Sequence, residues 1–163
     1  MDRRTDHTMS NPLWDYSLAV YGLDGVATTC LALQDTFGLD VNLLLYAAWL
    51  AHRERRLSHA HLIEVDGLIA EWREKVVQPL RLLRRQLREY PGAAGIHDEI
   101  KALELRAEQQ QQDMMYAFFQ RADGLPWAHG PLQENMALVA RFSSPNDENW
   151  AAAIGDLTTL FPR

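Results

Sequence analysis

The segment YGLDGVATTCLALQDTFGLDVNLLLYAAWL, residues 21–50, decides the fold of this chain. Within it, Val26, Cys30, Leu33 and Phe37 follow one another at steps of four, three and four. This is the spacing of one face of an α-helix. The same segment holds polar residues in an otherwise apolar stretch, so it is also the first place to search for a site.

Turn and cap residues divide the segment into two helices. Asp24 is suited to cap the first helix, because a short carboxylate accepts hydrogen bonds from free N–H groups of a first turn. Gly38 is suited to end it, because glycine enters the left-handed region without steric cost. Asp40 then caps a second helix, and Asp40→Ala should cost about 1 kcal/mol. That second helix, at about residues 41–55, is apolar on nearly all sides and should be buried at the centre of the protein.

The flanking sequence predicts further helices. Asn11 and Pro12 have the residue types of a helix start. Ser58 can cap a long amphipathic helix over residues 58–90, with a kink expected near residues 75–79 because Pro79 lies inside it. The break PGAAG at residues 91–95 separates this helix from a second long one.

The second long helix is expected over residues 96–122, antiparallel to the first. Its inner stripe is predicted to comprise Ile96, Ile100, Leu103, Ala107, Gln110, Met114 and Phe118. The run QQQQ at residues 109–112 is interpreted as solvated helix surface. Pro131 should open a short helix, and Ser144 should cap the last one, with Pro145 at its first position. The prediction is an all-α, single-domain bundle of about six or seven helices over residues 11–163, after a flexible tail at 1–10.

Part of the chain resembles a known family. The stretches NPLWDYSLAVYG, GVATTCLALQDTFGLDVNLLLYAAWLA and WREKVVQPLRLLRRQL are similar to a family of short proteobacterial proteins classified as a domain of unknown function. The resemblance covers about residues 11–110, and LQDTFGLDVNLLL is its most specific part. It implies the fold and a bacterial origin, and it implies no activity.

Composition limits the classes of function. A single cysteine excludes an internal disulfide and suits the cytosol. The first ten residues are polar, so no signal peptide is expected, and no 18-residue apolar run predicts a transmembrane segment. The net charge of −6 disfavours nucleic acid as a partner. The charge is uneven, however: residues 52–90 hold nine Lys/Arg against six Asp/Glu, and the remainder holds seven against sixteen.

The basic segment contains a row of arginines on one helix face. Arg81, Arg84, Arg85 and Arg88 stand at i, i+3, i+4 and i+7, and Arg73 lies about two turns earlier. Few acids are spaced to pair with them within the same helix. Two alternatives stay open: Glu99, Glu104 and Glu108 of the second long helix pair with the row, or the row binds an acidic protein or an anionic small molecule.

A polar pocket is the second candidate site, at the helix junction of residues 30–42. The residues that would line it are Tyr16, Tyr21, Gln34, Asp35, Asn42 and Trp49. The alternative is structural: Asp35 or Asn42 hydrogen-bonds to free backbone groups of the turn.

The sequence offers little for catalysis or metal binding. Cys30 lies on an apolar stripe and is interpreted as a core residue. His59 and His61 are two residues apart and point away from each other on one helix, so no metal site is predicted. No catalytic residue and no cofactor is assigned, because nucleotide-binding and hydrolase motifs are absent. The favoured hypothesis is a non-catalytic interaction or regulatory module that uses the arginine face, in a bacterial cytoplasm and open to homo-oligomer formation. The alternative is a small-molecule binder or enzyme with its pocket at residues 30–42.

Overall fold

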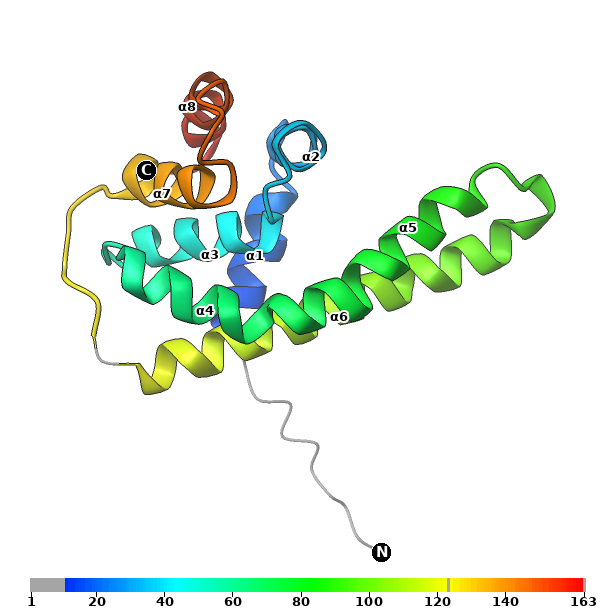
Figure 1. The fold of residues 1–163 in the computed structure, drawn as a ribbon, viewed down its shortest axis with the longest axis horizontal. Coiled ribbons are helices and arrows are strands. Elements are labelled where there is room, and N and C mark those ends of the chain that lie inside the picture. Colours follow the sequence, from blue (N-terminus) through cyan, green and yellow to red (C-terminus); the bar gives the residue numbers. More distant parts are fainter. Residues whose placement is uncertain (1–10, 123, 163) are drawn as a thin grey trace, which may run out of the picture.

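A computed structural model describes residues 11–122 and 124–162. The described residues form eight α-helices, one π-helical turn, one 3-10 turn and no strand, with a single isolated bridge between Arg55 and Trp127. The helices are α1 (Pro12–Tyr21), α2 (Val26–Phe37), α3 (Val41–His52), α4 (His59–Trp72), α5 (Gln78–Leu87), α6 (Ala94–Arg121), α7 (Leu132–Ser143) and α8 (Trp150–Leu160) (Figure 1). The all-α prediction is confirmed. The tail predicted at residues 1–10 lies outside the described residues.

Two of the predicted cap residues around α2 and α3 are confirmed and one is wrong. Gly38 ends α2 with φ of 68°, and its N–H donates to the Gln34 carbonyl at 3.0 Å. Asp40 caps α3 by accepting from the backbone N–H of Asn42 at 2.8 Å. Asp24, however, does not cap α2. Gly25 takes that position with φ of 84°, a backbone conformation that glycine adopts at little cost, and no side chain caps the helix.

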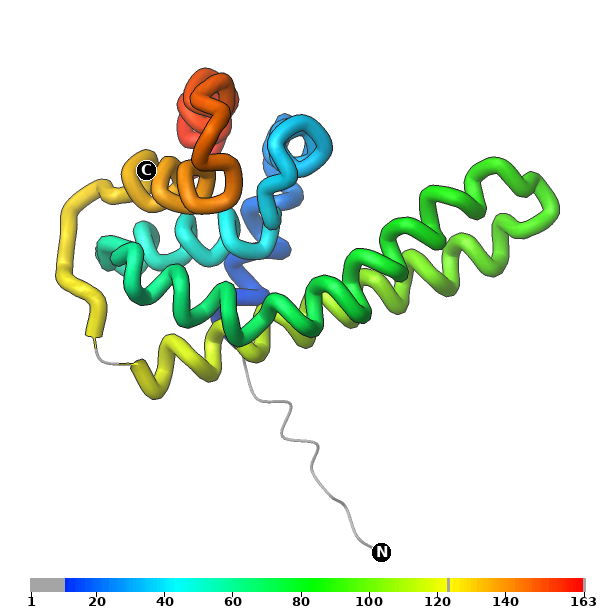
Figure 2. The backbone as a smooth tube through the Cα atoms, in the orientation of Figure 1, coloured from blue at the N-terminus to red at the C-terminus, as the bar shows by residue number. Residues whose placement is uncertain are grey.

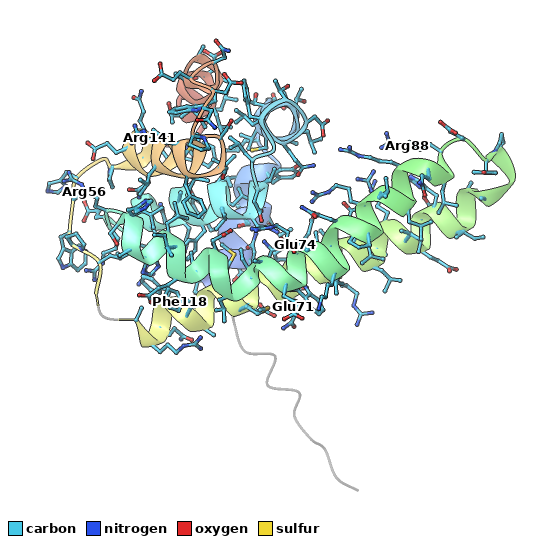
Figure 3. All side chains as sticks on the ribbon, in the orientation of Figure 1. Arg56, Glu71, Glu74, Arg88, Phe118 and Arg141 are labelled. Atoms are coloured by element: carbon cyan, nitrogen blue, oxygen red, sulfur yellow. The ribbon has the colours of Figure 1, made fainter. Side chains whose placement is uncertain are left out.

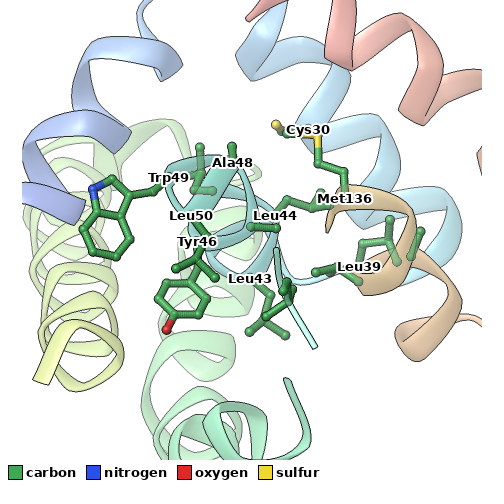
Figure 4. Packing of buried hydrophobic residues seen from close by; sticks show 14 of the residues in the cluster. Cys30, Leu39, Leu43, Leu44, Tyr46, Ala48, Trp49, Leu50 and Met136 are labelled. Carbon is green, nitrogen blue, oxygen red and sulfur yellow. The ribbon is translucent and has the colours of Figure 1, made fainter. Parts of the chain in front are cut away.

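Helix α3 is the buried centre of the fold. Every residue from Asn42 to Leu50 is buried, and α3 packs against α1, α2, α6 and α7. Figure 4 shows Tyr46 and Trp49 on one side of α3, and Cys30 and Met136 closing the core on the other side. The helix ends at His52, whereas the prediction placed its end near residue 55. Glu54, just after the helix, adopts a positive φ of 54°. An all-round apolar sequence thus becomes a helix with no solvated face.

The first long helix changes its geometry before its proline. Figure 2 shows one uninterrupted path from α4 through a π-helical turn (Arg73–Val77) into α5. In this wide turn the Gln78 N–H donates to the carbonyl of Arg73, five residues earlier. Pro79 has no N–H to offer the carbonyl of Lys75, and its ring would clash there in a regular α-helix. The departure from α geometry therefore falls where the proline predicts it.

Helix α7 packs against another side of α3, and α8 packs against α7 and α2. Asn135 of α7 is buried, and its Nδ2 donates to the carbonyls of Ala47 at 3.2 Å and Arg55 at 3.0 Å. Its Oδ1 accepts from the Leu57 N–H at 2.9 Å. The predicted start of the last helix at Ser144 is wrong, because α8 begins only at Trp150. The intervening residues form a turn in which Asp147 accepts from the N–H of Asn149.

His61 is a buried histidine that should make stability depend on pH. Its Nε2 lies 2.7 Å from the Tyr46 hydroxyl, and burial lowers its pKa from 6.5 to about 4. Between these values the unfolded chain binds a proton that the folded chain does not, so stability should fall as pH drops from 6.5 to 4. We expect a loss of about 1–3 kcal/mol from this group.

The measurement is urea unfolding of the wild-type protein and of His61→Asn across this pH range. The variant should lose less stability than the wild type as pH falls. His59→Asn is the control, because His59 is exposed and lies two residues away on the same helix. Equal pH slopes for the wild type and His61→Asn would contradict this assignment.

Candidate functional site

The two long helices form an arm that projects from the helical body. We use "the arm" for residues 78–108, in which α5 and the first part of α6 run antiparallel beyond the other helices in Figure 1. No residue of α5 is buried, and large apolar side chains along the arm are exposed. They are Leu82, Leu83, Tyr90, Ile96, Leu103 and Leu105. The predicted inner stripe of α6 is therefore wrong for Ile96 and Leu103, since no described residue covers the arm at those positions, and it is also wrong for Gln110, which is exposed.

Glu104 anchors the arginine row within the arm. Its side chain is buried and accepts a hydrogen bond from Arg81 Nε at 3.2 Å. It also accepts from both Nε and Nη2 of Arg84, the latter at 3.3 Å. Glu108 accepts from Arg81 Nη2 at 3.0 Å. The hydrogen bond to Glu104 raises the pKa of Arg84, and burial raises the pKa of Glu108. Two of the three acids named from the sequence thus pair with the row. Glu99 makes no ion pair among the described residues.

The other three arginines differ in their surroundings. Arg73 lies apart from the row and donates to Asp66 Oδ1 at 2.7 Å and Asp40 Oδ2 at 3.2 Å. Burial opposes the charge of Arg73, but its hydrogen bonds and the charges of these two carboxylates outweigh that and raise its pKa. Arg85 reaches across to Asp35 of α2 at 2.8 Å in an exposed ion pair. Arg88, near the end of the arm in Figure 3, makes no ion pair among the described residues.

The six residues of the predicted pocket do not converge on one point. Tyr16 stacks on His52, and Trp49 lies in the core. Asp35 faces outward to its arginine partner. Tyr21, Gln34 and Asn42 do line a common surface, described below.

The structural alternative for Asp35 and Asn42 is also wrong in its detail. In the described part of the chain neither side chain accepts from the backbone of the turn, where Asp40 alone supplies the cap. Asn42 instead accepts from Gln112 Nε2 of α6 at 3.0 Å. The reason is that α6 crosses the N-terminus of α3 closely enough for its own amides to satisfy the buried polar groups there.

The burial of two glutamines on α6 was not predicted from the sequence. Gln111 and Gln112 are fully buried, although the QQQQ run was predicted to be solvated. Gln111 Nε2 donates to Asp40 Oδ2 at 3.0 Å. A signal was present: Glu104, Ala107, Gln111 and Met115 follow steps of three, four and four, which place them on one helix face. Their polarity concealed it, because a buried polar residue depends on a partner from another helix.

A groove runs between the N-terminal helices and the arm. It encloses about 680 Å³ and extends along α6 from Asp98 to Gln112, which is about 21 Å at 1.5 Å per residue. Helices α1, α2 and α3 supply an apolar wall comprising Trp14, Leu18, Tyr21, Leu31, Val41 and Leu45. The arm supplies a charged wall comprising Arg81, Arg84, Arg88, Asp98, Lys101, Glu104 and Glu108.

The groove also contains polar atoms without partners. Ser17 Oγ and Gln112 Oε1 are buried and make no hydrogen bond to the rest of the described chain. Both residues line the groove. Buried polar groups are normally satisfied, so these two atoms are exceptions among the described residues.

Cys30 lies outside the groove, in the buried core. Burial raises the pKa of the Cys30 thiol to about 12, so this cysteine stays protonated in the core. Across the described ranges no cluster of three His, Cys, Asp or Glu side chains could hold a metal ion. No single described helix is both long and apolar enough to cross a membrane; α1 and α2 meet the length and composition test only as a pair, bent by 99°.

The chain is thus an all-α protein in which a two-helix arm projects from a helical body. Comparison with known proteins assigns it to a family. The chain belongs to the family described as "Protein of unknown function (DUF2390)", whose model matches residues 12–115. The matched residues include α1–α5 and most of α6, and hence both walls of the groove. No curated protein and no solved structure matches the chain.

Proposed function

We propose that this chain is a non-catalytic interaction module of the bacterial cytoplasm, which holds an acidic, amphipathic helical segment of a partner protein in the groove. The observation that carries the proposal is the pairing of an apolar wall with a charged wall, on which basic side chains outnumber acidic ones, along about 21 Å. That length accommodates a helix of about fourteen residues. Helix-in-groove recognition uses apolar anchors at i, i+3, i+4 and i+7, which the apolar wall would receive.

The charge of the groove supports an acidic partner. Four basic and three acidic side chains line it, on a chain whose net charge is −6. Arg81 and Arg84 are engaged by Glu104 and Glu108. Arg88 and Lys101 make no ion pair among the described residues, and both are exposed, so they are the cations free to meet a carboxylate.

The exposed leucines of the groove support a macromolecular occupant. Leu18, Leu31 and Leu105 are 51%, 42% and 50% exposed, which leaves apolar area uncovered on both sides of the groove. Covering such area releases water, which favours formation of a complex. A long partner helix covers all three, because they lie on α1, α2 and α6.

A binding assay with charge-reversed variants of the protein and of the peptide tests the proposal. The probe is a labelled, fourteen-residue helical peptide with leucines on one face and flanking glutamates, measured by fluorescence anisotropy. Arg88→Glu with Lys101→Glu should weaken binding about tenfold or more, because two ion pairs become repulsive. A peptide with lysine in place of glutamate should show the reverse preference and bind this double variant better than the wild type.

Arg106→Glu is the matched control. It reverses a charge on the same helix outside the groove and should leave binding unchanged. Leu31→Asp should weaken binding of both peptides. No binding of the acidic peptide, or equal binding of the two peptides by the wild type, would contradict the proposal.

A further inference from the structure

A second cavity lies beside the α2–α3 turn and shares Gln34, Asn42 and Arg81 with the groove. It encloses about 380 Å³ between that turn, the π-helical segment, α6 and the end of α7. Its wall is polar: carboxylates from α3's cap, α4 and the π-helical turn meet amides from α5 and α6. We infer that this cavity binds a small organic cation, a primary amine or guanidinium compound.

The first step in the argument is an unsatisfied acceptor. Gln111 is fully buried, lines the cavity, and its Oε1 has no hydrogen-bond partner in the described chain. The orientation of this amide is fixed, because Nε2 faces Asp40 Oδ2 at 3.0 Å and a carboxylate needs a donor there. Oε1 therefore stays an acceptor whose donor, a water or a bound molecule, is not part of the described chain.

Two of the three carboxylates in the cavity can accept further hydrogen bonds. Asp40 is saturated: Oδ1 caps α3, and Oδ2 accepts from Arg73 and Gln111. In Asp66 only one carboxylate oxygen accepts a hydrogen bond: Oδ1 accepts from Arg73, and no described residue donates to Oδ2. Glu74 makes no ion pair with any described residue. An amide oxygen and two carboxylates thus offer acceptors to a donor-rich ligand.

The charged side chains that line the cavity also favour a cationic ligand. Three acids, Asp40, Asp66 and Glu74, line the cavity with Arg73 and Arg81. Arg81 is also held by Glu104 and Glu108, so it is neutralised from outside the cavity. The remaining excess is negative and favours a cation.

The size of the cavity favours an organic cation over a bare metal ion. At about 30 Å³ per water, its volume corresponds to roughly a dozen waters. The described chain offers no group of three His, Cys, Asp or Glu placed for a metal. The π-helical turn forms one wall, and such turns occur frequently at functional sites.

Thermal shift and calorimetry with defined probes test this inference. The probes are putrescine, spermidine and agmatine, with 1,4-butanediol as the neutral counterpart. At least one cation should raise the melting temperature, and the diol should not. Glu74→Gln should weaken that cation's affinity about tenfold, because a charge-assisted hydrogen bond becomes neutral.

Glu71→Gln is the matched control. Glu71 lies one turn earlier on the same helical segment, pairs with Lys75 at 2.6 Å, and does not line the cavity. Figure 3 shows Glu71 and Glu74 on different sides of this segment. Both are exposed, so neither substitution should alter the melting temperature without a ligand.

Two results would overturn the inference: no cation shifts the melting temperature, or Glu71→Gln weakens binding as much as Glu74→Gln. The result is independent of the groove, because Glu74 does not line it. Acidic-peptide binding should be the same for Glu74→Gln and the wild type, so failure of one proposal leaves the other standing.

Discussion

Glu104→Ala should destabilise the protein by about 3–5 kcal/mol, because it leaves two arginines facing each other without their shared acceptor. The Glu104 side chain is only 8% exposed, and it accepts from both Arg81 and Arg84. Arg81 keeps Glu108 at 3.0 Å, but Arg84 has no other acid within ion-pair distance among the described residues. Breaking a buried pair from one side costs far more than losing an exposed one.

Glu99→Ala is the control for this prediction. Glu99 lies on the same helix, was an equal candidate by sequence spacing, and is exposed, so its removal should change stability by less than about 0.5 kcal/mol. Chemical denaturation of both variants and of Glu104→Gln gives the comparison. Glu104→Gln should fall between them, since an amide oxygen still accepts but carries no charge. Similar stabilities for Glu104→Ala and Glu99→Ala would show that the arm does not depend on this pair.

The elements that the sequence predicts well are those governed by local chemistry. Gly38 and Asp40 sit where backbone sterics and capping require them, and Pro79 marks the π-helical turn within a few residues. The burial of α3 follows from its composition alone, since an apolar helix has no face to present to water. Each of these depends on residues within a single helix or next to its ends.

The features that the sequence predicts poorly depend on contacts between distant segments. Ile96 and Leu103 have the spacing of a core stripe, but the arm extends past the helices that would cover them. Gln111 has the composition of surface, but it lies opposite the cap of α3, 71 residues away in sequence. Spacing along one helix cannot identify the helix that faces it. The groove was missed for the same reason, since its two walls come from opposite ends of residues 14–112.

The arginine row combines a feature that the sequence predicts with one that depends on distant contacts. Its position on one face of a helix follows from spacing, and its pairing with α6 was one of two alternatives. The structure pairs Arg81, Arg84 and Arg85 within the chain and leaves Arg88 without an ion pair in the described part. Binding of a partner is therefore proposed for the outer end of the row and Lys101, and the inner part holds the arm together.

Asp40→Ala should cost about 3 kcal/mol, well above the roughly 1 kcal/mol expected from helix capping alone. Asp40 Oδ1 caps α3, while Oδ2 accepts from Arg73 of the π-helical turn and from Gln111 of α6. This one carboxylate therefore joins the start of α3 to Arg73, 33 residues away in sequence, and to Gln111, 71 residues away. Its loss also leaves the buried Gln111 amide without its only partner among the described residues.

Ser58→Ala separates the two contributions, because Ser58 Oγ caps α4 through the His61 N–H at 3.1 Å and makes no other side-chain bond in the described chain. It should cost about 1 kcal/mol, and the excess for Asp40→Ala measures the tertiary contacts. In a double-mutant cycle with Arg73→Met, Asp40→Ala should show a coupling energy of about 1 kcal/mol or more. Urea unfolding supplies all four free energies. Additive effects of the two substitutions, with Asp40→Ala costing no more than Ser58→Ala, would reduce Asp40 to a helix cap and remove its role in holding the α2–α3 turn against α6.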